Sequence, residues 1–231
     1  IAKNIDIAVT TGNSFTTATA IEGALRAAPP MGIDPDRAQV AVVGAAGSIG
    51  RTCARILARR APRVNIIDLN PEALEKVADE IRSESDAVVN TFTEVHAGIR
   101  DADIVASATS AVSAIIHPRD IKVGAVVCDV ARPRDVSARV RQERDDVLIV
   151  DGGVVAVPGD VDFRVNFGFP PRTAFACMSE TMMLALDGRY ENFTLGKTVS
   201  VEQVEEINAM AAKHGFELAG FRSFERAVSD E

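Results

Sequence analysis

The sequence predicts an α/β fold built on a doubly wound parallel sheet, flanked by helices from an interrupted second domain. Three observations predict it. Short apolar strands alternate with helical patterns through the centre of the chain. A glycine-rich turn joins the first of these strands to a helix, and an acidic residue ends the next strand.

The expected strands are short and mostly lack polar alternation, as in parallel strands covered on both faces. They are predicted at residues 39–43, 63–68, 87–90, 103–106, 125–129 and 147–151. Between them, helices are predicted at residues 49–60 and from Pro71 to about Arg82, with Asn70 as N-cap. One helix is predicted before the sheet, at residues 14–28. Two are predicted after it, at residues 171–187 and 201–214.

This order of elements divides the chain into three parts. Residues 1–36 are expected to be a remnant of a substrate domain with a connecting helix. Residues 37–155 form the dinucleotide-binding domain, and residues 156–231 are helices that return to the substrate domain. The sequence begins with isoleucine instead of methionine, which indicates that the N-terminal part of a longer protein is missing.

Composition excludes several classes of protein. A hydrophobic content of 47% over 231 residues is enough for a sizeable core, and the net charge is -8. Lysine and arginine nowhere form a dense run, so neither a nucleic-acid partner nor an anionic membrane surface is expected. Because the sequence has no long apolar run and no secretory signal, we expect a cytoplasmic protein without an integral membrane segment.

The three cysteines suit neither a disulfide framework nor a metal site, because they are far apart and in no ligand-like spacing. No metal site is therefore predicted. Cys53 and Cys128 fall on apolar stretches of a helix and a strand and are interpreted as core residues. Cys177 is treated separately below.

Three glycines, Gly44, Gly47 and Gly50, stand at GxxGxxG spacing between the first strand and its helix. Such a turn lets the backbone approach a pyrophosphate, which N–H groups at the helix N-terminus can hold. This context predicts a Rossmann domain that binds NAD(P). The turn residues expected to contact the cofactor are Gly44, Ala46, Gly47, Ser48 and Ile49. A glycine-rich turn without a nucleotide is the alternative.

Asp68 ends the second strand, at the position where a carboxylate can accept both hydroxyls of the adenosine ribose. A carboxylate repels a 2′-phosphate, and the adjoining Leu69 and Asn70 offer no guanidinium in its place. These three residues are therefore expected beside the cofactor, and Asp68 favours NAD(H). The alternative is that Asp68 caps the helix that begins at Pro71.

Two further turns follow strand ends on the expected ligand side of the sheet. Ala108 and Thr109 are small enough to leave room for the nicotinamide ribose. Gly153 would let the backbone approach the nicotinamide ring. Ordinary turn chemistry is the alternative for all three residues.

Several segments carry a resemblance to a known family. They are residues 10–14 (TTGNS), 43–50 (VGAAGSIG), 151–153 (DGG), 175–177 (FAC) with Glu180, 190–193 (YENF) and 213–216 (KHGF). Together they are similar to the long-chain acyl-[acyl-carrier-protein] reductases of cyanobacteria and to related predicted amino-acid dehydrogenases. The resemblance implies reduction of an acyl thioester, from acyl carrier protein or acyl-CoA, to a fatty aldehyde. It also implies NADP(H) as the alternative cofactor, and a substrate-binding region preceding the first residue.

The layout also resembles the shikimate and methylene-tetrahydropterin dehydrogenases, in which residues 10–17 would line an interdomain cleft. Asn13, Ser14 and Thr16 are then expected to contact the substrate. Alternatively, Asn13 or Ser14 is only the N-cap of the following helix. This resemblance keeps two other functions open: an NAD(P)-dependent dehydrogenase of a small hydroxy or amino acid, and a non-catalytic dinucleotide-binding domain.

The last feature is the thiol of Cys177. On a helical wheel Phe175, Met178 and Met182 share an apolar face, and Cys177 lies almost opposite it. A helix beginning near Pro171 would place the thiol in the second turn, where the helix dipole helps a thiolate little. Our hypothesis is that Cys177 attacks the acyl thioester and carries an acyl-enzyme; a packing cysteine is the alternative. Apolar surface left by the missing region would favour a homo-oligomer.

Overall fold

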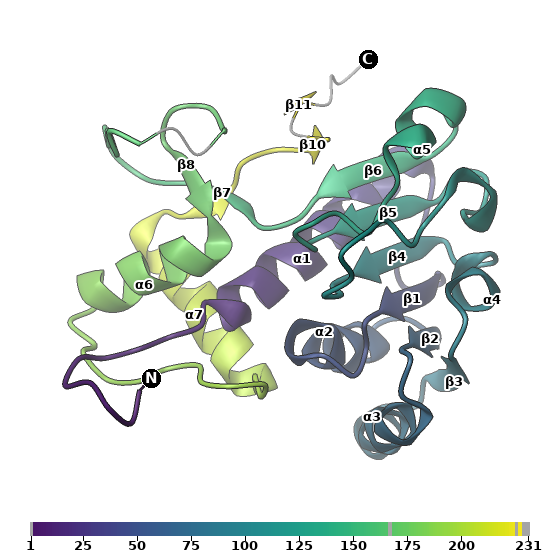
Figure 1. The fold of residues 1–231 in the computed structure, drawn as a ribbon, viewed down its shortest axis with the longest axis horizontal. Coiled ribbons are helices and arrows are strands. Elements are labelled where there is room, and N and C mark those ends of the chain that lie inside the picture. The colour runs from purple at the N-terminus through teal and green to yellow at the C-terminus, as the bar shows by residue number, and fades with distance from the viewer. Residues whose placement is uncertain (1, 166–167, 225, 228–231) are drawn as a thin grey trace.

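A six-stranded parallel sheet forms the centre of the structure (Figure 1), a computed structural model that describes residues 2–165, 168–224 and 226–227. The strand order is β3-β2-β1-β4-β5-β6, and every neighbouring pair is parallel. The strands are β1 (Gln39–Val43), β2 (Arg63–Ile67), β3 (Val88–Phe92), β4 (Ile104–Ser107), β5 (Val126–Asp129) and β6 (Leu148–Asp151). The order reverses between β1 and β4, which confirms the predicted doubly wound sheet.

Helices cover both faces of this sheet. Along β1, Val40 and Val42 face one apolar cluster, while Ala41 and Val43 face the other. The first cluster is covered by α1 (Asn13–Ala27), α2 (Ser48–Ala58) and α3 (Pro71–Glu84), and η1 (Pro29–Met31) follows α1. The second is covered by α4 (Val95–Ile99) and α5 (Ala138–Glu143), and by Ile116 and Ile121 on either side of η2 (Pro118–Asp120). The strands lack polar alternation because both faces of the sheet are covered, as expected.

The C-terminal part builds a second, smaller unit. Its antiparallel sheet has the order β8-β7-β9 and packs with two helices. The elements are β7 (Val154–Ala156), β8 (Thr173–Phe175), α6 (Ala176–Leu186), α7 (Val201–His214) and β9 (Glu217–Leu218), followed by the pair β10 (Arg222–Ser223) and β11 (Arg226–Ala227). Helix α7 has the predicted bounds.

Helix α1 joins the two units. Its first turns, with Phe15 and Ala18, lie in the apolar cluster of α6 and α7, whereas Ala20 and Ala24 lie in the cluster under the parallel sheet. Figure 1 shows α1 passing from the sheet to α6 and α7. Whatever orients the start of α1 therefore also orients α6 against the sheet.

The prediction of a single helix at residues 171–187 is wrong. Residues 173–175 form β8, which pairs with β7 through Val154 and Phe175, and the helix begins only at Ala176. The predicted apolar face is also not the buried one. The side chains of Ser179, Glu180 and Met183 are buried instead, while Phe175, Met178 and Met182 are only partly buried.

Local capping is partly as predicted. Asn70 caps α3, because its side chain accepts a hydrogen bond from the N–H of Ala73 at 3.1 Å. The N-cap of α1, in contrast, is Gly12 with a φ of 77°, so neither Asn13 nor Ser14 has the capping role considered for it. Of the helices in the described ranges, none combines the length and the apolar composition that crossing a membrane requires.

Candidate active site at the carboxyl ends of the parallel strands

A groove with a volume of about 520 Å³ lies where the strand order reverses, at the carboxyl ends of β1, β2 and β4. In doubly wound sheets this is the position of the ligand crevice. The residues predicted to touch the cofactor that line the groove are Gly44, Gly47, Ser48, Ile49, Asp68, Leu69, Ala108 and Thr109. Asn13, predicted as a substrate contact, lines it as well.

The glycine turn is shaped by close backbone contacts. At Gly44, with a φ of 80°, a β-carbon would lie 2.6 Å from the carbonyl oxygen of Ala108. At Gly50 a β-carbon would lie 2.1 Å from the carbonyl oxygen of Gly44. Larger residues at these positions would push the turn away from β4 and open the floor of the groove.

The first turn of α2 can hold an anion. Gly47 is the N-cap and supplies no side-chain acceptor, and the next residues, Ser48 and Ile49, line the groove. The N–H groups at the start of a helix have no partner within the helix, and the helix dipole favours negative charge there. A pyrophosphate therefore fits this end of the groove.

The carboxylate of Asp68 bridges the glycine turn and the start of α3. Its Oδ2 accepts from the N–H of Ala46 at 3.1 Å, and its Oδ1 accepts from the N–H of Asn70 at 3.2 Å. Asn70 is the N-cap of α3, so the alternative interpretation of Asp68 as the cap of this helix is wrong. A carboxylate has about four acceptor sites, so both oxygens can also accept from ribose hydroxyls. Leu69 beside it is 89% exposed.

Other residues of the groove were not predicted from the sequence. Thr93, Val95, Ala111 and Ile115 line it from the segments that follow β3 and β4. The only feature of the sequence that could have identified these residues is their position after predicted strands, because the carboxyl ends of parallel strands meet at one edge of the sheet.

A buried carboxylate that was also not predicted orients Thr109. Asp135 accepts from the hydroxyl of Ser107 at 2.6 Å, from the N–H of Thr109 at 3.0 Å and from its hydroxyl. Thr109 is therefore held in one orientation at the groove.

Five of the predicted contacts do not line the groove. Two of them, Ala46 and Asn70, donate their N–H groups to the carboxylate of Asp68. The carbonyl of Gly153 accepts from the N–H of Ala176 at 2.8 Å, so this glycine holds the start of α6. The hydroxyl of Thr16 donates to the carbonyl of Gly12 at 2.9 Å. Ser14 is buried and donates to Oε2 of Glu180 at 2.5 Å, which gives it a structural role in place of the expected substrate contact.

Cys177 is exposed and is the second residue of α6. It therefore lies in the first turn, not in the second as predicted, and nearer the positive end of the helix dipole. Partial burial is the main influence that raises the pKa of the Cys177 thiol, and Glu180 adds to it. The backbone N–H groups of Met178 and Cys177 lower the same pKa. By contrast, burial raises the pKa of Cys53 to about 12, as expected for a core cysteine.

A buried carboxylate fastens the helix of Cys177 to the rest of the molecule. Glu180 accepts from the N–H of Phe15 at 2.9 Å and from the hydroxyls of Thr194 at 3.0 Å, Ser14 and Thr10. Its partners come from the start of α1, from the segment before it and from the loop before α7. Glu180 thus fixes one turn of α6 against the start of α1.

The thiol and the groove are joined through the start of α1. Gly12 packs against the backbone of Cys177. The next residue, Asn13, lines the groove and donates from Nδ2 to the Ser48 hydroxyl at 3.2 Å. Two consecutive residues, Gly12 and Asn13, therefore connect the backbone of Cys177 to the wall of the phosphate-binding groove.

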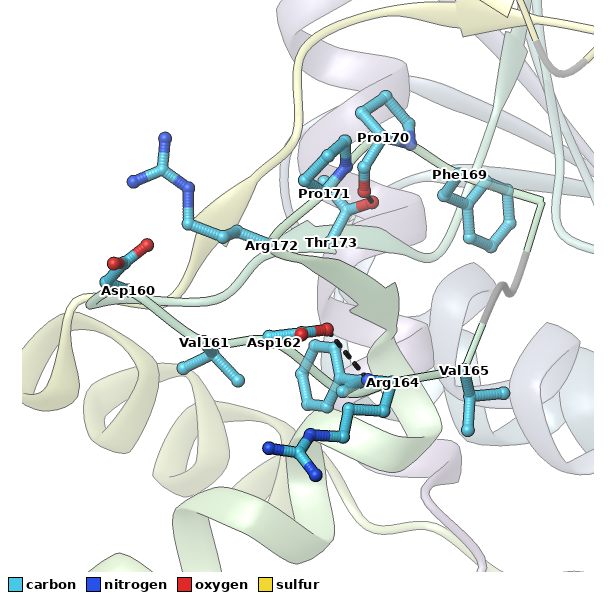
Figure 2. Close-up of a pocket in the computed structure, with 11 residues that line it drawn as sticks. Asp160, Val161, Asp162, Arg164, Val165, Phe169, Pro170, Pro171, Arg172 and Thr173 are labelled. Atoms are coloured by element: carbon cyan, nitrogen blue, oxygen red, sulfur yellow. Dashed lines mark hydrogen bonds between the residues drawn. The ribbon is translucent and has the colours of Figure 1, made fainter.

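The β7–β8 loop encloses a more voluminous hollow, of about 880 Å³ (Figure 2). Figure 2 shows the guanidinium groups of Arg164 and Arg172 pointing away from one another. Binding sites usually gather a few convergent polar groups. None of the residues predicted to bind a cofactor or substrate lines this hollow, so we place the candidate site in the glycine-lined groove.

Comparison with known proteins finds a matching family and several relatives. The model of the family described as shikimate / quinate 5-dehydrogenase matches residues 31–152. The chain is 32% identical over 222 residues to the aminotransferase PigE of Serratia sp., covering 93% of this chain and 25% of that protein. It is 30% identical over 219 residues to the long-chain acyl-[acyl-carrier-protein] reductase of Synechococcus elongatus, covering 90% of this chain and 61% of that protein.

Solved structures are similar at a lower level of identity. The 5-ketofructose reductase of Gluconobacter sp. is 17% identical, with a TM-score of 0.47 over 82% of this chain and 61% of that one.

The chain spans less than two thirds of the length of either curated relative, the aminotransferase PigE or the acyl-[acyl-carrier-protein] reductase.

Proposed function

We propose, from the premise that the chain belongs to the shikimate / quinate 5-dehydrogenase family, that it reduces an acyl thioester to an aldehyde with a nicotinamide cofactor. The premise makes the chain a dinucleotide-binding domain of the oxidoreductase type. The proposal adds a substrate class, the thioester of acyl carrier protein or coenzyme A, and a nucleophile, Cys177.

The groove supports the nicotinamide cofactor. The first turn of α2 would hold the pyrophosphate, and Asp68 would accept the ribose hydroxyls. Because Asp68 would repel a 2′-phosphate, we propose NAD(H) as the preferred form, with NADP(H) as the alternative. When bound, this cofactor supplies the hydride for the reduction.

The observation that carries the proposal is the position of Cys177: it is exposed in the first turn of α6, and it packs against Gly12, the residue before Asn13 of the groove wall. Its thiolate would attack the carbonyl carbon of the thioester, and the carrier thiolate would leave and take up a proton. The acyl group would then remain on Cys177. After the carbonyl carbon gains a hydride, the bond to Sγ breaks, which releases the aldehyde and restores the thiolate.

The relatives support the same substrate class. One is a long-chain acyl-[acyl-carrier-protein] reductase by name, and its similarity covers 90% of this chain, an extent that includes Cys177 and Glu180. The other is named an aminotransferase and shares only 25% of its own length with this chain.

Intact-protein mass spectrometry with a long-chain acyl-CoA tests the nucleophile. We expect wild type and Cys53→Ala to gain one acyl group that neutral hydroxylamine removes, and Cys177→Ala to gain none. Cys53 is the matched control because its thiol is buried. An adduct of the same extent on Cys177→Ala would contradict the role of Cys177.

A second candidate, direct oxidation of a small hydroxy or amino acid, is favoured by the family model itself. That model covers residues 31–152, which include every lining residue of the groove except Asn13, and do not include Cys177. In this alternative Cys177 is structural. Supplying acyl-CoA with reduced cofactor, and small hydroxy acids with oxidised cofactor, separates the two: aldehyde formation that Cys177→Ala abolishes supports the first candidate.

A further inference from the structure

A second groove begins one helical turn after Cys177. Its volume is about 430 Å³, and it shares no lining residue with the cofactor groove. One wall is formed by Thr181, Leu184 and Ala185 of α6, and the other by residues 6–10 of the N-terminal segment. We call this the α6 groove. Residues 189–191 close the end that is farther from Cys177.

Helix geometry aligns the thiol with this groove. Successive residues of an α-helix are about 100° apart, so positions i, i+4 and i+7 share one flank. Cys177, Thr181 and Leu184 hold these positions, and Ala185 lies next to them. A group attached to Sγ of Cys177 and extended along α6 would therefore pass directly over Thr181 into the groove.

The wall opposite α6 is held in place by backbone hydrogen bonds. The N–H of Phe193 donates to the carbonyl of Val9 at 3.2 Å, and the N–H of Thr11 donates to the carbonyl of Thr194 at 3.0 Å. The N–H of Val9 also donates to Oδ1 of Asn192 at 2.8 Å. The hydroxyl of Thr10 donates a hydrogen bond to Oε1 of Glu180. The N–H and carbonyl of Val9 and the hydroxyl of Thr10 are thus paired with other parts of the protein, whereas the carboxylate of Asp6 lines the groove at an exposed position.

The α6 groove is bordered by apolar side chains that are exposed to solvent. Ile7 is 72% exposed and Tyr190 is 80% exposed. The charge of Arg189 at the far end is compensated by Glu191 and Glu206. An aliphatic ligand would remove the apolar surface from water without separating a charge from its partner.

We propose that the α6 groove binds the aliphatic chain of the acyl group carried by Cys177. The inference rests on the proposed function for the acyl-enzyme, and it adds the place where the enzyme distinguishes long from short acyl chains. The volume is within the range of small-molecule sites. Groove and thiol lie on the same helix, so a bound chain would hold the thioester carbonyl close to the cofactor groove.

Alkyl methanethiosulfonates of increasing length test the α6 groove without cofactor, carrier or turnover. The Cys177 thiolate attacks the reagent, forms a mixed disulfide and releases methanesulfinate, and Cys177→Ala gives the background. Burying a methylene contributes about 0.8 kcal/mol, so we expect the modification rate to rise up to about fourfold per added methylene until the groove is filled. The methyl reagent reports the intrinsic reactivity of the thiol.

Two charge substitutions on α6 provide the matched comparison. Ala185→Glu places a carboxylate in the α6 groove, whereas Leu186→Glu places one at an exposed position outside it. We expect Ala185→Glu to remove the dependence on chain length and Leu186→Glu to keep it. Ile7→Glu changes the facing wall and is expected to behave like Ala185→Glu without altering the helix.

Rates that do not depend on chain length in the wild-type protein would overturn the inference, as would equal effects of the two helix substitutions. Rates that fall for every reagent as the protein concentration rises would identify a second copy of the chain as the occupant and also overturn it. If chain-length dependence is found but acyl-CoA gives no adduct, the α6 groove stands and the proposed function fails. If the adduct forms but the rates are flat, the function stands and the groove assignment fails.

Discussion

Gly12 and Cys177 are in direct backbone contact. A β-carbon on Gly12 would lie 2.3 Å from both Cα and Cβ of Cys177, and the φ of Gly12 is 77°. Both the space and the backbone conformation therefore require glycine. The contact sets how closely α6 approaches the start of α1, and so how near the thiol lies to the cofactor groove.

We expect Gly12→Ala to lower the free energy of unfolding by about 3 kcal/mol, combining the left-handed conformation with an overpacked contact. Urea denaturation measures it. Gly32→Ala is the control, because Gly32 has a φ of 72° and no atom within 4 Å of a β-carbon. That variant should lose only about 1–2 kcal/mol. Equal losses would show that the contact with Cys177 has no energetic consequence.

Glu180→Gln tests the buried carboxylate. A glutamine keeps one acceptor oxygen and turns an NH₂ group toward donors such as the Phe15 N–H, so we expect a loss of about 1–3 kcal/mol in urea denaturation. Glu22→Gln removes an exposed carboxylate that pairs with Arg26 at 3.0 Å, and should cost about 0.5 kcal/mol or less. A Glu180→Gln loss no larger than the control would contradict the anchoring role.

The parallel sheet could be predicted because its signals are local. Apolar strands, the glycine turn and the Asn70 cap each occupy a few adjacent residues, and the structure reproduces β1 and α7 with the predicted bounds. The groove followed from topology once the strand order was known. Asp68 lines this groove, but its bond to the N–H of Ala46 was not predicted.

The surroundings of Cys177 could not be predicted, because they depend on residues far apart in the sequence. The start of α6 is set by the pairing of Phe175 with Val154, which overrides the helical pattern of the preceding residues. The partners of Glu180 include Ser14 and Thr194. No periodicity in the helix itself reveals that a glutamate is among its buried residues, so the hydrophobic pattern indicated the wrong face.

Asp68→Ala tests the preference for the cofactor. Removing the carboxylate removes its repulsion of a 2′-phosphate and its bonds to ribose hydroxyls, so we expect weaker NADH binding and a gain for NADPH. Titration of the fluorescence of the reduced cofactor gives both dissociation constants. Asn70→Ala, which removes the neighbouring cap of α3, should cost about 1 kcal/mol of stability and leave the preference unchanged. Tighter binding of NADPH than NADH to the wild-type protein would contradict the assignment.

Asp129 predicts how stability depends on pH. It ends β5 and is fully buried, and burial raises its pKa from 3.8 to about 6, although the N–H groups of Val136 and Ala131 oppose the rise. The folded protein therefore keeps this proton over a pH range in which the unfolded chain has released it. Stability contributed by the group is present below the unfolded pKa and is lost as the pH rises through the folded pKa.

Between about pH 4 and about pH 7 we expect Asp129 to lower the free energy of unfolding by about 3 kcal/mol. Asp129→Asn cannot ionise and keeps one oxygen for the backbone donors, so the difference between the variant and wild type should change by this amount across the range. Urea denaturation at both ends of the range measures it. Parallel pH profiles for the two proteins would mean that the carboxyl of Asp129 ionises equally easily in the folded and unfolded chains, contrary to its burial.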